Sequence, residues 1–138
     1  MAASVSRSEV DRRMERFQEV CRAEGLKLTH QRMEIFNAVA GTGEHPDAET
    51  VYKRVRKRMP TVSLDTIYRT LWLLDDLGLI TVLGPSRERT RFDANLKRHH
   101  HFVCTRCQKV EDVVWPALDE MSLPAAAGEW GDIYQVHA

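Results

Sequence analysis

The sequence lacks the features that would place it in a membrane or a secretory pathway. No apolar run approaches the roughly 20 residues that a membrane-spanning helix needs. The first eight residues also lack the apolar segment of a signal peptide. Only three cysteines occur, two of them as one Cys-x-x-Cys, which suits a reducing compartment and a metal better than a disulfide framework. We therefore expect a cytoplasmic protein that does not bind a membrane.

An excess of charge of either sign is also missing. The 20 lysines and arginines balance 20 aspartates and glutamates, which argues against a protein that holds nucleic acid by bulk positive charge. Any DNA binding must therefore come from local clusters and from shape. One basic cluster occurs at residues 53–58. It is either a phosphate-binding surface or a solvated helix face, and the sequence alone does not choose between them.

The residues that carry chemistry are concentrated at positions 93–112. This stretch contains three consecutive histidines, a Cys-x-x-Cys and an aspartate at each end. Imidazole, thiolate and carboxylate groups are the side chains that bind transition metals. On a strand, His99 and His101 point to one face and His100 to the other. Because the histidines are internal and continue into an apolar Phe102-Val103, we predict a metal site rather than a tag remnant.

Four amphipathic helices are predicted before the histidines. The first spans residues 6–24, and the others follow the suitable N-caps Thr29, Asp47 and Ser63. Glycines or prolines punctuate their ends, with Pro60 closing the third helix. In the loop before the third helix, Pro46 is expected to push His45 into an extended conformation.

A two-stranded hairpin is predicted next, at residues 79–83 and 90–93, with the turn at 84–89. Helices, a last helix with a polar N-terminal face, and then a hairpin are the order of a winged helix-turn-helix. On that interpretation Tyr68 and Arg69 could reach base edges or phosphates. Arg87, Arg89 and Arg91 on the wing could reach phosphates, although each arginine alone could be a plain surface residue.

The last part of the chain has an α/β pattern. A strand is predicted at residues 110–115, a short helix at 117–123 after Pro116, a linker at 124–128 and a final strand at 133–136. A segment of this size is small for an independent core. We therefore expect a metal, a partner subunit or both to complete it.

Several motifs together resemble the ferric uptake regulator (Fur) family, over about residues 10 to 137. They are Leu26-x-Leu-Thr-x-Gln-Arg32, His45-Pro46, Val62-Ser-Leu-Asp-Thr-Ile-Tyr-Arg-Thr-Leu71, Gly78-Leu-Ile80, Arg91-Phe-Asp93 and His99-His-His-Phe-x-Cys-x-x-Cys107. The resemblance implies a homodimeric repressor of α+β class that binds a palindromic operator in double-stranded DNA and is not an enzyme. It has a winged-helix DNA-binding domain with wing and hinge at 1–93 and a small α/β metal-binding and dimerisation domain at 94–138.

The resemblance also implies which residues act. The regulatory metal, Fe(II) or Mn(II), would lie between the domains on His45, Asp93, His99, His101 and Asp112. The DNA-binding residues would be Lys27, Thr29, Arg32, Ser63, Asp65, Thr66, Tyr68, Arg69, Arg87 and Arg89.

Two ligand positions indicate a branch of the family. Asp93 and Asp112 are both aspartate, as in the peroxide-sensing, PerR-like branch, whereas the iron-sensing branch typically has glutamate at both. Glu111 beside Asp112 is the other candidate for the second ligand. The resemblance then implies that bound iron reacts with peroxide, oxidises His45 or His99 to 2-oxo-histidine and releases DNA, whereas manganese gives a peroxide-insensitive repressor.

Other functions are weighed against this one. A sensor of iron, zinc or manganese supply in the same family is the nearest alternative. A small metalloenzyme would use the same ligands to activate water or oxygen, but a chain with a winged-helix half leaves little room for a substrate pocket. A metal-independent DNA-binding or scaffold protein is the third.

The Cys-x-x-Cys departs from the family pattern. Members with a structural Zn(II) have a second such pair, which would fall beyond Ala138 here, and a closed zinc site needs four ligands. The chain would then be naturally short, or cut before the second pair, or have Cys104 and Cys107 without zinc. Without zinc, the two are reduced thiols in a turn or a disulfide.

Overall fold

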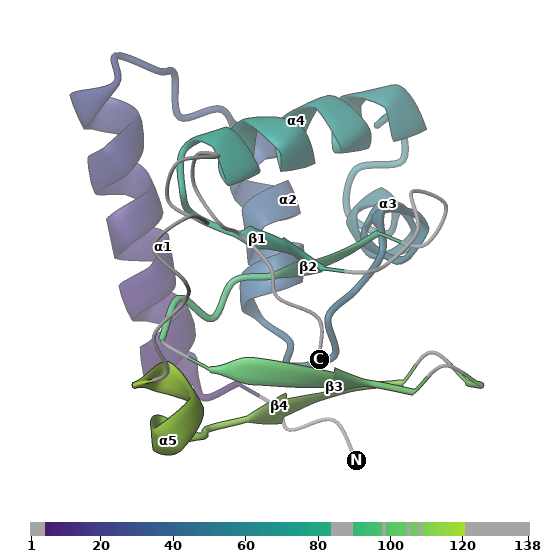
Figure 1. Ribbon diagram of the computed structural model, residues 1–138. Coiled ribbons are helices and arrows are strands. Elements are labelled where there is room, and N and C mark those ends of the chain that lie inside the picture. The colour runs from purple at the N-terminus through teal and green to yellow at the C-terminus, as the bar shows by residue number, and fades with distance from the viewer. Residues whose placement is uncertain (1–4, 84–89, 98, 105, 108, 121–138) are drawn as a thin grey trace, which may run out of the picture.

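The computed structural model describes residues 5–83, 90–97, 99–104, 106–107 and 109–120, and its elements are labelled in Figure 1. Four helices come first, followed by two pairs of strands and a short helix. In chain order the elements are α1 (Arg7–Ala23), α2 (His30–Ala40), α3 (Ala48–Arg56), α4 (Leu64–Asp76), β1 (Thr81–Leu83), β2 (Arg91–Asp93), β3 (His100–Val103), β4 (Val110–Val113) and α5 (Pro116–Asp119). None of the helices in these residues is long and apolar enough to cross a bilayer.

The first four helices begin at polar side chains that cap their free N–H groups. The predicted caps Thr29, Asp47 and Ser63 each accept a hydrogen bond from the backbone N–H three residues later, and Ser6 does the same for α1. The prediction that Pro60 closes the third helix is wrong, because α3 already ends at Arg56. The N–H groups of residues 58 and 59 both bond to the carbonyl of Val55, which turns the chain earlier.

One apolar core holds these helices and the first strand pair together. α2 contacts α1, α3, α4 and β2, so it lies at the centre of this unit. Cys21 is a core thiol as predicted, with 1% of its surface exposed. Every buried member of the core falls between residues 17 and 94, and the largest fully buried side chains are Phe17, Phe36, Phe92, Ile35, Ile67, Leu71, Leu74, Leu79 and Ile80.

The strands form two separate antiparallel pairs. β1 pairs with β2, placing Thr81 opposite Asp93, and β3 pairs with β4, placing His101 opposite Asp112. Figure 1 shows α4 above β1–β2, and β3–β4 below them. Helices followed by the β1–β2 hairpin confirm the α+β class. The predicted wing turn at 84–89, with Arg87 and Arg89, lies outside the described residues, as do the linker at 124–128 and the strand at 133–136.

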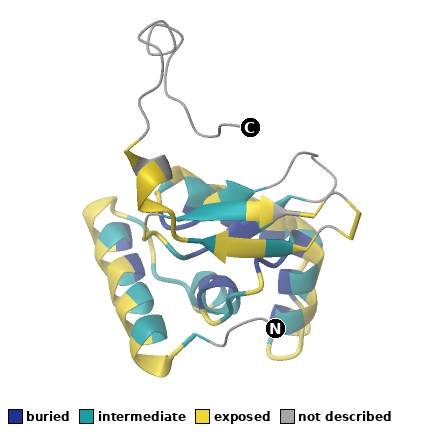
Figure 2. Cartoon of the chain, turned by 60° about the horizontal axis from the view of Figure 1, so that its bottom comes forward, coloured by how far each residue is buried: buried dark blue, intermediate teal, exposed yellow. Residues whose placement is uncertain are grey.

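The β3–β4 hairpin is attached to the rest of the chain in a different way. None of its described side chains is buried in the apolar core, and Figure 2 colours both strands as intermediate or exposed where they are described. Phe102, Val114 and Trp115 expose 62%, 75% and 48% of their surface. The hairpin instead contacts the helical unit through histidines and carboxylates. The domain boundary at residue 93 stays a prediction.

Candidate metal centre

His45 enters the site from the loop between α2 and α3. Its side chain is buried, and its φ is +56°, so the expected extended conformation is wrong. The loop is held on β2 because the N–H of Phe92 donates to the carbonyl of Pro46, at 3.0 Å, and because Asp47 bridges to Arg91. A left-handed backbone at a residue other than glycine costs about 1–3 kcal/mol. The contacts of the loop and of the imidazole offset that cost and turn His45 inward.

Asp93, at the end of β2, is the carboxylate around which the imidazoles gather. Its Oδ1 accepts from the N–H of Asn95, at 2.9 Å, which leaves Oδ2 pointing to the histidines. The Nε2 atoms of His99, His101 and His45 lie 2.8, 3.1 and 3.5 Å from Oδ2. Burial disfavours the charged form of Asp93, but hydrogen bonds from the imidazoles and from Asn95 outweigh it and hold the pKa well below its usual range.

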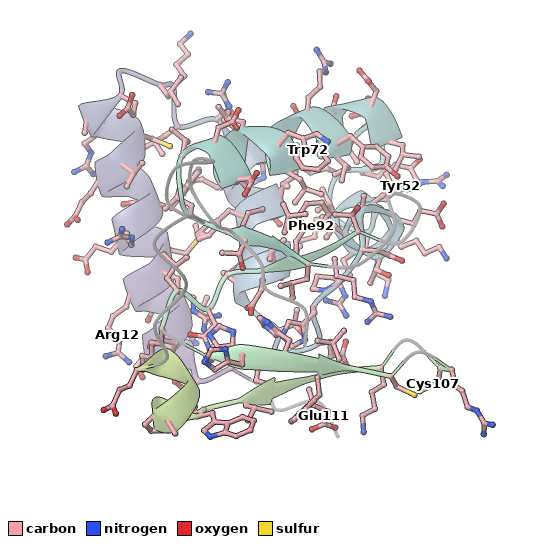
Figure 3. All side chains as sticks on the ribbon, in the orientation of Figure 1. Arg12, Tyr52, Trp72, Phe92, Cys107 and Glu111 are labelled. Atoms are coloured by element: carbon pink, nitrogen blue, oxygen red, sulfur yellow. The ribbon has the colours of Figure 1, made fainter. Side chains whose placement is uncertain are left out.

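Asp112 on β4 supplies the second carboxylate. Its Oδ1 lies 2.7 Å from Nε2 of His45, 3.2 Å from Nε2 of His101 and 3.7 Å from Nε2 of His99. Glu111 is directed elsewhere, because neighbouring residues of a strand alternate between faces. Its carboxylate is 58% exposed and pairs with Lys109 at 2.7 Å, and Figure 3 shows it on the side of β4 away from the helices. Of the two candidates, the structure brings Asp112 to the histidines.

The imidazoles are oriented by their second nitrogen atoms. Nδ1 of His99 contacts the carbonyl of Lys97, so a proton on Nδ1 is donated there and Nε2 is left to face the carboxylates. Nδ1 of His45 is buried and has no hydrogen-bond partner among the described residues. His101 stands edge-on to both other rings. The predicted alternation is confirmed to this extent, since His99 and His101 reach the same two carboxylates.

This donor set fits a divalent transition metal. The ligand atoms of His45, Asp93, His101 and Asp112 all lie within 4.8 Å of one another, and His99 adds a third imidazole. Nitrogen and oxygen donors without sulfur suit Fe(II), Mn(II) or Zn(II). Two carboxylates would neutralise the charge of such an ion. A metal bound here would replace the present nitrogen–oxygen contacts with bonds to itself.

Metal affinity at this site is expected to fall as the pH decreases. Burial disfavours a charged His45 and a charged His99, but the nearby carboxylates, and for His99 the carbonyl of Lys97, outweigh it and raise both pKa values above 6.5. A metal needs the neutral imidazole, so protons compete with it. The competition should therefore begin at a higher pH than for ordinary histidines. Titrating Mn(II) into the protein across the neutral range would show this, and a constant affinity would contradict it.

Cys104 and Cys107 lie at the far end of the β3–β4 hairpin, where Figure 3 labels Cys107. Both are exposed free thiols, and the N–H of Cys104 donates to the carbonyl of Lys109, at 2.9 Å. Hydrogen bonds from the backbone of Cys107 and Arg106 lower the pKa of Cys104. Neither thiol contacts the histidine cluster, so they form a separate group, and zinc there stays a prediction.

Thiol labelling is expected to separate the cysteines. Burial raises the pKa of Cys21 and shields it, so iodoacetamide should modify Cys104 and Cys107 in the folded protein and Cys21 only after unfolding. Peptide mass analysis reads out each site. Adding Zn(II) tests the metal, because protection of both exposed thiols would indicate that they bind it. Early labelling of Cys21 would contradict the packing of α1.

The predicted DNA-binding residues fall on two segments. Asp65, Tyr68 and Arg69 are exposed on the N-terminal half of α4, with Arg69 Nε 3.0 Å from Asp65 Oδ2. Ser63 caps α4 and its hydroxyl also bonds to that of Thr66. At the start of α2 the side chain of Lys27 is exposed, whereas Thr29 is a cap and the guanidinium of Arg32 donates to the carbonyl of Lys27. Several of these side chains thus also shape the backbone.

Two other surface features concern the same part of the chain. In the basic cluster at 53–58, Arg54 pairs with Glu44 at 2.7 Å and Arg58 with Glu34 at 3.6 Å, so both earlier interpretations of this cluster stay open. Trp72 on α4 is 45% exposed and was missed from the sequence. Its position four residues after Tyr68 was the signal that could have found it.

Comparison with known proteins finds relatives along most of the chain. The family described as the ferric uptake regulator family matches residues 23–131. The peroxide-responsive repressor PerR of Staphylococcus epidermidis is 31% identical over 112 residues, which cover 81% of this chain and 75% of that protein.

Solved structures agree with this assignment. The ferric uptake regulator Fur of Helicobacter pylori has a TM-score of 0.72 at 22% identity and covers 98% of this chain and 89% of its own, which supports the fold. PerR from Streptococcus pyogenes has a TM-score of 0.57 at 27% identity and covers 82% of this chain and 72% of its own. The chain belongs to the ferric uptake regulator family of metal-responsive, DNA-binding repressors.

Proposed function

We propose that this chain is a homodimeric repressor that binds a palindromic operator when a divalent metal joins its two halves, and that peroxide releases it by oxidising a ligand histidine. One observation carries the proposal. His45 of the helical unit and His99, His101 and Asp112 of the second half converge on the same two carboxylates. A metal bound by these groups would link segments that are far apart in the sequence.

The way in which the hairpin is attached supports control by metal. Because no described side chain of β3–β4 is buried in the apolar core, its position depends on the polar cluster. A bound metal would therefore select one placement of the hairpin against α1–α4. The exposed apolar side chains Phe102 and Val114 offer surface for a second copy of the chain. In such a dimer, metal would set the spacing between the two α4 helices, and a palindromic operator selects one spacing.

Peroxide sensing is supported by the ligand set. Both carboxylates are aspartates, as in the branch that the sequence resembles, and the S. epidermidis relative is a peroxide-responsive repressor. Bound ferrous iron would supply the electrons that break the peroxide O–O bond. The chain would hold His45 and His99 where an oxygen atom can add to the ring carbon between their nitrogens. That addition makes Nε2 a poor ligand, so the link between the two halves is lost.

The test compares two metals in one protein. Protein loaded with Fe(II) without oxygen is treated with equimolar hydrogen peroxide, and the peptides that contain His45 and His99 are weighed while duplex binding is followed. We expect one of them to gain a single oxygen atom and the DNA to be released. The Mn(II) form should bind the same duplex and keep unmodified histidines. If the iron form stays unmodified and bound, peroxide sensing is wrong and a sensor of metal supply takes its place.

A further inference from the structure

Two large aromatic side chains stand exposed on one face of α4. Tyr68 is 41% exposed and Trp72 is 45% exposed. Residues four apart on a helix are neighbours, so the two rings border one another. Within residues 5–83 and 90–94, which the structure describes, no other large apolar side chain is exposed. Scattered apolar residues are common on protein surfaces, but an adjacent aromatic pair marks a surface that contacts a partner.

The indole of Trp72 is held in place at one edge. Its ring stands 6.0 Å from the ring of Phe92, at an interplanar angle of 76°. Phe92 belongs to β2 and is almost fully buried, and Figure 3 labels both residues on their neighbouring elements. Trp72 therefore sits where α4 meets the β1–β2 hairpin. An aromatic ring that is already held loses little conformational freedom when it binds a partner.

The position of Trp72 along α4 matches the size of a DNA groove. Tyr68 and Arg69, which are predicted to contact DNA, lie one turn closer to the start of the helix. At a rise of about 1.5 Å per residue, Trp72 is about 12 Å from Leu64 along the axis. The major groove is also about 12 Å wide, so an α4 that enters it with its N-terminal half brings Trp72 to the wall of the groove. Deoxyribose and thymine methyl groups provide apolar surface there.

We infer that Trp72 binds DNA by packing on deoxyribose or thymine methyl groups, extending the contact of α4 by one turn. The inference rests on the proposed function. A protein partner is less consistent with this surface, because charged Asp65 and Arg69 share the face and leave only two rings of apolar area. An apolar contact differs from a phosphate contact because it releases no counterions, so it leaves the salt dependence of binding unchanged.

The experiment uses the full, metal-loaded chain and a duplex selected from a random pool by the wild type. We expect Trp72→Ala to weaken binding on the order of tenfold without changing metal affinity or the slope of affinity against salt. Trp72→Phe keeps an aromatic ring against Phe92, so it should fold normally and bind with an intermediate affinity. Arg69→Gln is the matched control on the same face, and it should weaken binding and also reduce the salt slope.

Fluorescence gives a second readout that packing alone would not change. Duplex binding should shield the wild-type protein from acrylamide, and this shielding should be smaller in Trp72→Phe. If Trp72 only packs on the β1–β2 hairpin, Trp72→Ala will lower the unfolding temperature, whereas Trp72→Phe will match the wild type in affinity and shielding, and the inference is overturned.

The remaining arms locate the contact and separate the two levels of the argument. With uracil in place of thymine, a loss of affinity in the wild type but not in Trp72→Ala assigns the methyl groups, and equal affinity assigns deoxyribose. If the wild type binds the selected duplex and Trp72→Ala binds it equally well, the inference alone fails. If the metal-loaded wild type enriches and binds no duplex at all, the proposed function fails and the inference with it.

Discussion

Replacing Asp93 with asparagine is expected to lower the affinity of the protein for Mn(II) by at least about 100-fold, which is ~2.7 kcal/mol. Oδ2 of Asp93 lies within 3.5 Å of all three imidazole nitrogens. The substitution removes one of two negative charges that would balance the cation. It also introduces an amide that cannot bind metal through its nitrogen. Because the site is buried on the β2 side, water is poorly placed to substitute for the carboxylate.

The measurement is a Mn(II) titration of the purified variant, with circular dichroism to check that it is folded. Glu111→Gln is the matched control. It removes a carboxylate next to Asp112, but one that is 58% exposed and paired with Lys109. We expect this control to bind Mn(II) like the wild type. If Asp93→Asn binds as tightly as the wild type, or if Glu111→Gln weakens binding as much, the assigned ligand set is wrong.

Removing the side chain of His45 is expected to abolish the effect of metal on DNA binding. The other ligands belong to β2 and to the second half of the chain, so they should still hold an ion with reduced affinity. That ion would no longer pull on the loop between α2 and α3, and it would not select one arrangement of the two halves. A coupling of about 1–3 kcal/mol, which is typical between two sites in one protein, would therefore be lost.

Glycine is the appropriate substitution at this position. The φ of +56° is strained for alanine, whereas glycine adopts it freely, so His45→Gly removes the imidazole without adding backbone strain. His30→Ala removes a histidine that is 70% exposed at the start of α2 and serves as the control. Duplex affinity is measured with saturating Mn(II) and with chelator. A His45→Gly protein that still binds DNA more tightly with metal would show that His45 does not link the halves.

Much of the local structure could be predicted because it depends on neighbours in the chain. Thr29, Asp47 and Ser63 cap helices by bonding to N–H groups only three residues away. The alternation of His99 and His101 follows from the two-residue period of a strand. The end of α3 was placed too late, because Pro60 marks where a helix must have stopped and not where it stops first.

The assembly of the site needed the tertiary structure. His45 and Asp112 are 67 positions apart, and no periodicity relates them. The resemblance to a family supplied both residues, but the pairing of β3 with β4 decided between Asp112 and Glu111. The conformation of His45 was decided by the bridge between its loop and β2, against the preference of a residue that precedes proline. The exposure of Trp72 depended on how α4 packs on Phe92.

The sequence by itself therefore determined the helices, the kind of ligands and the family, because caps, side-chain chemistry and motifs are read along the chain. Only the tertiary structure decided which carboxylates face the imidazoles and how the hairpin is attached. Both depend on contacts between distant segments. Those contacts are polar rather than apolar, which is the physical reason why a metal ion can control the arrangement of this protein.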